Sequence, residues 1–109
     1  MLKAFLDESY RFPNPVNASA DGTRLDPWRD EPLMLGGEID KLASNIALAR
    51  DAAGVHFRSD SIEGLKLGEA VGIGLLADES RTYGERFNGF ILTRFDGTKV
   101  TIVDGLVHT

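Results

Sequence analysis

The chain has 109 residues, and its 12 Lys and Arg against 17 Asp and Glu give a formal net charge of −5 at pH 7. This length fits a single domain over residues 1–109, because domains usually contain about 100–150 residues. The absence of Cys excludes disulfides and cysteine-ligated metals. The acidic balance argues against a nucleic-acid partner, since phosphate neutralisation needs a basic surface, so an anionic ligand would need a local positive site.

No stretch approaches the roughly 20 consecutive apolar residues that a bilayer span requires. The best candidate, residues 70–77, is short and interrupted by glycines. The N-terminal MLKAFLDESY has one early Lys and no apolar region of the kind found in signal peptides. We therefore expect a soluble chain with no membrane span and no signal peptide, whose compartment the sequence leaves open.

The first third of the chain predicts little regular structure. Residues 1–9 place Leu2, Phe5 and Leu6 at helical spacing, which predicts the end of a helix. Residues 10–36 contain all four prolines together with Asn and Gly turn signals, which predict a long loop. Long loops inside compact domains are uncommon, and this one contains apolar residues that indicate packing on another part of the structure.

Residues 37–82 predict a pair of helices. Apolar residues recur at three-and-four spacing up to Gly54, which is a typical helix-ending residue. A second helix is expected from Asp60, which would cap it, with Glu63 reaching back. Its glycines recur every fourth residue, a pattern that favours close approach of another helix: Gly64, Gly68 and Gly72.

Residues 83–109 predict a β-hairpin and a tail. Two segments rich in β-branched and aromatic residues, 87–95 and 99–103, flank the turn signal Asp96-Gly97-Thr98. An isolated hairpin is marginally stable in water, so this one should pack on the helices or on a partner. The predicted fold class is therefore mainly α, with a C-terminal β-hairpin.

The candidate site lies between the two predicted helices, in the segment Arg50-Asp-Ala-Ala-Gly-Val-His56-Phe-Arg58-Ser-Asp60. Arg50 would end one helix, His56 would lie on the turn, and Asp60 would begin the next helix. A guanidinium, an imidazole and a carboxylate at one corner suit the binding of an oxyanion. The alternative is a surface Arg, a turn His and an ordinary helix cap.

The spacing Arg50, five residues, His56, three residues, Asp60 resembles the third signature motif of the vanadium-dependent haloperoxidase and type 2 phosphatidic acid phosphatase superfamily. Residues 36–76 and the closing segment 87–102 resemble the bacterial haloperoxidase-like branch. The resemblance implies the helical-bundle portion of a haloperoxidase-like fold. The serine that precedes the arginine in the family motif is Ala49 here.

The resemblance also implies a role for each residue. Arg50 would hold oxygens of vanadate or of phosphate, its isosteric alternative, with Arg58 as a further candidate or a surface residue. His56 would be the ligand to the vanadium of vanadate in a haloperoxidase, or the nucleophile in an acid phosphatase. Asp60 would orient His56 through its second ring nitrogen. In the haloperoxidases, vanadate and peroxide oxidise halide.

The first two family motifs, including a Pro-Ser-Gly-His segment, are absent from the chain. The resemblance therefore implies the C-terminal part of such an enzyme, with an incomplete active site. We expect either a companion chain equivalent to the missing N-terminal portion or a homo-oligomer. Three functions stay open: part of a haloperoxidase, part of an acid phosphatase, and a non-catalytic helical oligomerisation module.

Overall fold

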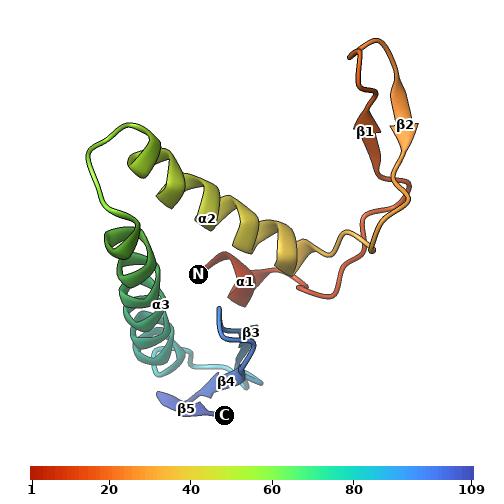
Figure 1. The fold of residues 1–109 in the computed structure, drawn as a ribbon. Helices are drawn as coiled ribbons and strands as arrows, with labels where there is room; N and C mark the ends of the chain where they lie inside the picture. Colours follow the sequence, from red (N-terminus) through yellow and green to blue (C-terminus); the bar gives the residue numbers. More distant parts are fainter.

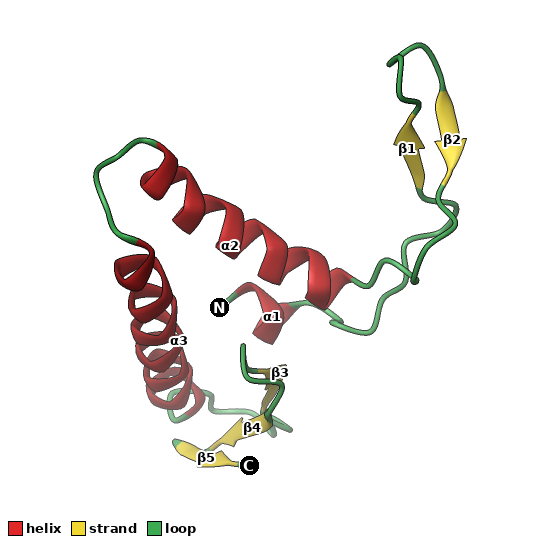
Figure 2. Cartoon of the chain, viewed as in Figure 1, coloured by secondary structure: helices red, strands yellow, loops and turns green.

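The computed structural model describes residues 1–109 as three helices and two small antiparallel sheets (Figures 1 and 2). In chain order the elements are α1 (Leu2–Phe5), β1 (Val16–Ala18), β2 (Leu25–Pro27), α2 (Leu35–Ala52), α3 (Arg58–Ser80), β3 (Phe90–Thr93), β4 (Lys99–Val103) and β5 (Leu106–His108). None of the helices is long and apolar enough to cross a membrane.

The prediction of a mainly α fold with a C-terminal hairpin is wrong. The C-terminal region forms a three-stranded sheet in the order β3-β4-β5, and β1 pairs with β2 inside the segment expected to be a loop. The third strand exists because Asp104 and Gly105, with φ of 49° and 79°, form a two-residue turn between β4 and β5. Such a turn matches the right-handed twist of the strands it joins.

The helices do not form a bundle either. The long helices α2 and α3 meet only at the turn that joins them and diverge from it, with α1 between them (Figure 1). The N-terminal helix is also shorter than predicted, because Leu6 adopts an extended conformation (φ −126°, ψ 149°) that ends α1 after Phe5.

The core lies between the C-terminal half of α3 and the three-stranded sheet. Leu76 of α3 is 1% exposed, and Val100 and Ile102 of β4 are 1% and 0% exposed. Val100 and Ile102 alternate with more exposed residues along β4, as expected for a sheet with one buried face. This packing anchors α3 at its C-terminal end and leaves the N-terminal end of α3 and most of α2 outside the core.

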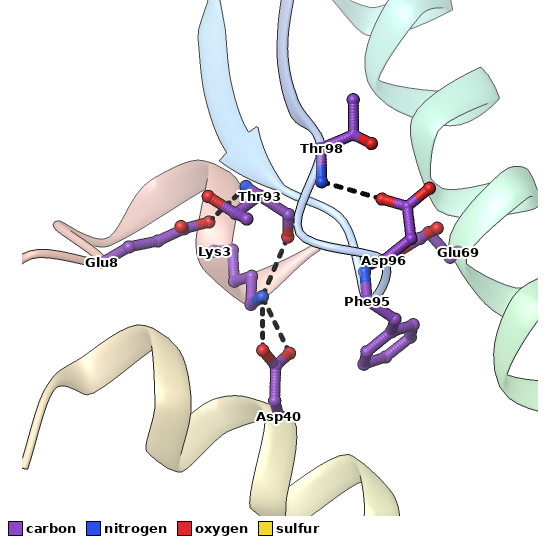
Figure 3. A network of polar contacts seen from close by, with 8 residues as sticks. All are labelled: Lys3, Glu8, Asp40, Glu69, Thr93, Phe95, Asp96 and Thr98. Atoms are coloured by element: carbon purple, nitrogen blue, oxygen red, sulfur yellow. Dashed lines mark hydrogen bonds and ion pairs between the residues drawn. The ribbon is translucent and has the colours of Figure 1, made fainter.

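The N-terminal segment ties the sheet to α2 (Figure 3). Lys3 donates to a carboxylate oxygen of Asp40 on α2 and to the backbone carbonyl of Thr93 on β3. The Thr93 amide in turn donates to Glu8 at 2.8 Å. By contrast, the β1–β2 hairpin extends away from the rest of the molecule (Figure 1).

Candidate functional site

The turn between α2 and α3 is built on one glycine. Gly54 has a φ of +72°, and its amide donates to the carbonyl of Asp51. The next amide, that of Val55, donates to the carbonyl of Arg50 at 3.3 Å. These two bonds form a Schellman motif, which ends a helix at a residue in the left-handed conformation. The turn brings the last residues of α2 close to the first residues of α3.

Arg50 and His56 meet across this turn. The Nη2 atom of Arg50 lies 3.2 Å from the Nε2 atom of His56. A guanidinium can only donate, so Nε2 must be the acceptor in this bond and the ring proton must then lie on Nδ1. The site therefore places a histidine lone pair beside a guanidinium fork, both of them exposed to solvent.

Asp60 is near His56 but does not hold it by a hydrogen bond. Its Oδ2 atom lies 3.6 Å from Nδ1 of His56, which is longer than a hydrogen bond, and it accepts the backbone amide of Phe57 at 3.0 Å. The expectation that Asp60 begins the helix as its cap is wrong. Phe57 takes that position in an extended conformation, and α3 begins at Arg58, so the Asp60 carboxylate reaches back instead.

The remaining two predicted residues lie apart from this contact. Arg58 is the first residue of α3, is exposed, and does not line the hollow around His56. Glu63, expected to reach back to the helix start, pairs with Lys66 at 2.8 Å instead.

One contact beside the site was not predicted from the sequence. The hydroxyl of Ser61 on α3 lies 2.8 Å from Oδ1 of Asp51 and 3.2 Å from the carbonyl oxygen of Ala47, both on α2. The other oxygen of the Asp51 carboxylate is buried and has no partner. Asp51 and Ser61 follow Arg50 and Asp60 in sequence, so their hydrogen bond holds the two ends of the site together. No local pattern indicates a pair ten residues apart across a turn.

A hollow of about 320 Å³ surrounds the site. His56 and Asp60 line it with side chains that are 42% and 50% exposed, and Arg50 lines it from α2. The rest of the lining comes from small or apolar residues and Ser61: Ala43, Ile46, Ala47, Gly64 and Leu65.

The donor set fits part of an oxyanion site. The imidazole lone pair can bind the central atom of a vanadate or accept a proton, and the guanidinium offers planar donors to the oxygens. One cation neutralises only part of the charge of such an anion, and the carboxylates of Asp51 and Asp60 are close by. No group of three or more His, Cys, Asp or Glu side chains is arranged to hold a metal ion.

The chain is similar in sequence to three vanadium-dependent bromoperoxidases. It is 43% identical over 103 residues to a vanadium-dependent bromoperoxidase of Corallina officinalis and 44% identical over 103 residues to one of Corallina pilulifera. It is also 37% identical over 109 residues to a vanadium-dependent bromoperoxidase of Ascophyllum nodosum. No protein-family model matches the chain.

These matches span 90–94% of the chain but only 17–20% of the length of each relative. The chain therefore corresponds to about a fifth of a bromoperoxidase. Over nearly all of its residues the chain is similar to part of these vanadium-dependent bromoperoxidases, which confirms the predicted resemblance to the haloperoxidase superfamily.

Proposed function

We propose that the chain provides the Arg50–His56 part of the vanadate site of a haloperoxidase-like enzyme, corresponding to the C-terminal portion of such an enzyme. The observation that carries the proposal is the 3.2 Å contact between the two side chains at the edge of a hollow. The names of the three relatives support vanadate as the ligand.

Each side chain has a distinct role in this proposal. His56 presents the unprotonated Nε2 as the ligating atom, and the negative charge of Asp60 favours the ring proton on Nδ1. Arg50 donates to oxygens of the anion and holds it against the ring. When bound, vanadate supplies the chemistry that oxidises halide with peroxide.

The site needs further cationic groups to bind vanadate tightly. Arg50 is the only cationic side chain that lines the hollow, and its surroundings are open to water, which weakens each electrostatic contact. We propose that the remaining groups come from the part of the enzyme that the chain does not span, or from a second copy. The isolated chain should then bind the small anion weakly and show little turnover.

Binding of vanadate to the 109-residue chain, followed by ⁵¹V NMR, tests the proposal. We expect His56→Ala and Arg50→Ala each to weaken binding by about tenfold, because a hydrogen bond to a charged group contributes roughly 1.5–3 kcal/mol. His108→Ala and Arg24→Ala are matched controls, since these residues lie on β5 and on the β1–β2 turn. Unchanged vanadate affinity in His56→Ala would contradict the proposal.

Assays with the same material separate the other functions. Bromination of a phenol by vanadate-loaded protein and peroxide supports the haloperoxidase function. Hydrolysis of a chromogenic phosphate ester that depends on His56 would assign the site to a phosphatase instead. Neither activity, together with a stable oligomer and no vanadate binding, would assign the chain to a non-catalytic module.

A further inference from the structure

Ser61 makes the only hydrogen bonds that join a residue of α2 to a residue of α3. Its hydroxyl lies 2.8 Å from Oδ1 of Asp51 and 3.2 Å from the carbonyl oxygen of Ala47. Ala47 and Asp51 are four residues apart and therefore lie on one face of the end of α2, in the turns that also contain Arg50. Because α2 and α3 diverge from the turn that joins them (Figure 1), no other hydrogen bond sets the separation of the two helices.

The Asp51 carboxylate depends on Ser61 for its one hydrogen bond. A hydroxyl has a single proton, and the shorter distance and the negative charge direct it to Asp51 rather than to the carbonyl of Ala47. The Oδ2 atom of Asp51 is buried without a partner. Removal of the hydroxyl would leave this half-buried carboxylate with no donor, so the end of α2 would have to move to hydrate it.

The first turn of α3 connects Ser61 to His56. The amides of Asp60 and Ser61 donate to the carbonyl of Phe57 at 2.9 and 3.3 Å, and the Asp60 carboxylate accepts the amide of Phe57 at 3.0 Å. Phe57 is the residue next to His56, and Ser61 lines the same hollow as His56. The Ser61–Asp51 bond therefore joins the end of α2, which contains Arg50, to the turn that fixes the backbone beside His56.

The contact between Arg50 and His56 needs such support. Both side chains are exposed, and a contact between exposed polar side chains contributes little while it orders a long arginine side chain. A binding site keeps its geometry when neighbouring groups lock its side chains in place. Asp51 and Ser61 are half-buried in this otherwise exposed turn, so they are the groups that provide the lock.

The family motif assigns no role to this pair. Asp51 is one of the five unspecified residues between Arg50 and His56, and Ser61 follows Asp60, the last residue of the motif. The alternative role for the pair is to stabilise the turn without any effect on the site. The two roles differ in whether the imidazole of His56 responds when the hydroxyl of Ser61 is removed.

We propose that Ser61 and Asp51 are a positioning pair, whose hydrogen bond holds Arg50 and His56 at the separation at which both reach one oxyanion. Ser61 acts through Asp51 and not by donating to the anion, since its proton is already engaged. The proposal rests on the proposed function for the identity of the anion. The position of His56 is tested without any anion.

The ¹⁵N NMR signals of the His56 ring test the pair in the 109-residue chain, at a pH high enough to keep the ring neutral. His108→Ala is the background, because it removes the only other histidine. Arg50 donates to Nε2, so the parent chain should show the tautomer with the proton on Nδ1. In Ser61→Ala both ring nitrogens should shift towards their values in the denatured chain. Ser61→Thr keeps the hydroxyl and Asp51→Asn keeps the acceptor oxygen, so both should retain the parent shifts.

Ser80→Ala is the matched control, because it removes a hydroxyl bonded to a carbonyl at the other end of α3. It should lower stability and leave the His56 ring unchanged, and chemical denaturation shows that each variant is folded. Equal ring shifts in Ser80→Ala and Ser61→Ala would overturn the proposal, since loss of stability would then explain both. Unchanged shifts in Ser61→Ala would also overturn it. So would denatured-like shifts in Asp51→Asn, because charge and not position would then control the site.

Vanadate binding, followed by ⁵¹V NMR, gives the second readout. We expect Ser61→Ala to weaken binding by about threefold to tenfold, which is the net contribution of about one hydrogen bond. Asp51→Asn should bind at least as tightly as the wild type, because it keeps the position and removes a negative charge near the anion. Wild-type affinity in Ser61→Ala would overturn the proposal. If the wild-type chain binds no vanadate, the proposed function fails, and the ring shifts alone decide whether the pair positions His56.

Discussion

Lys3 and Asp40 are 37 residues apart in sequence, and the Lys3 ammonium lies 2.7 and 2.8 Å from the two carboxylate oxygens of Asp40. The Lys3 side chain is only 11% exposed, and the Asp40 side chain is 37% exposed. The same ammonium donates to the carbonyl of Thr93 at 2.9 Å. This one group therefore links the N-terminal segment, α2 and the C-terminal sheet (Figure 3).

Replacing Lys3 should destabilise the fold. We expect Lys3→Met to lower the free energy of unfolding by about 1–3 kcal/mol, because Asp40 and the Thr93 carbonyl lose a charged donor in a partly buried place. Lys41→Met is the control, since Lys41 pairs with Glu38 on the exposed surface of α2 and should cost less than about 0.5 kcal/mol. Chemical denaturation measures both, and equal losses would contradict the role assigned to Lys3.

Gly54 should be the most sensitive residue of the turn that forms the site. We expect Gly54→Ala to cost about 1–2 kcal/mol, because its φ of +72° is unfavourable for a residue with a Cβ atom. Gly37→Ala, at an open helical position, should stabilise the chain by up to about 1 kcal/mol. Unfolding curves give both values. A neutral Gly54→Ala would mean that the turn is not held in the left-handed conformation.

Ser80 should stabilise the junction between α3 and the turn before β5. Its side chain is buried, and its hydroxyl donates to the carbonyl of Ala77 and accepts the amide of Gly105, both at 2.8 Å. We expect Ser80→Ala to cost about 1–3 kcal/mol, because the Gly105 amide loses its acceptor in a partly buried position.

Hydrogen exchange at the Gly105 amide should also become faster in Ser80→Ala. Thr82→Ala removes an exposed hydroxyl that bonds only to the carbonyl of Glu79, and it should change stability by less than about 0.5 kcal/mol. Unchanged exchange at Gly105 in Ser80→Ala would contradict the assigned hydrogen bond.

We expect the turn of the β1–β2 hairpin to keep its hydrogen bonds at low pH, because the pKa of the Asp21 carboxylate is lowered. The hydroxyl of Ser19, and next the amide of Thr23, donate to the Asp21 carboxylate and lower its pKa from 3.8 to about 2. A lowered pKa in the folded state stabilises the turn above pH 3.8, and this contribution is lost as the pH falls towards 2. Carboxyl ¹³C NMR should show Asp21 mostly ionised at pH 3. In Ser19→Ala its pKa should move back towards 3.8, and a wild-type midpoint near 3.8 would contradict the turn geometry.

The turns at Gly54 and Gly97 were predicted correctly because each depends on the conformational freedom of a single residue. Gly54 ends α2 because only a residue without a Cβ atom easily adopts the left-handed conformation there. The short spacing from Arg50 to His56 then brings the two side chains to one turn, whatever the rest of the fold does. The turn signal at Gly97, with a φ of 84°, marks the β3–β4 connection for the same reason.

Three of the five strands, β1, β2 and β5, were not predicted from the sequence. Asp104-Gly105 is as strong a turn signal as Asp96-Gly97, but the strand that follows it, β5, has only three residues and resembles a tail in sequence. The prolines around β1 and β2 favoured a loop, although proline is tolerated at the end of an edge strand such as Pro27 of β2. Each of the two Asp-Gly pairs in this region marks a turn between adjacent strands of the C-terminal sheet.

The sequence by itself determined the resemblance to the haloperoxidase superfamily, the end of α2 at Gly54 and the turn that joins Arg50 to His56, because these depend on residues close together in the chain. Only the tertiary structure decided that α3 packs on a three-stranded sheet, that Lys3 reaches Asp40, and that α2 and α3 diverge from the turn that joins them. These features depend on contacts between distant segments, and no local propensity specifies which apolar face finds which partner.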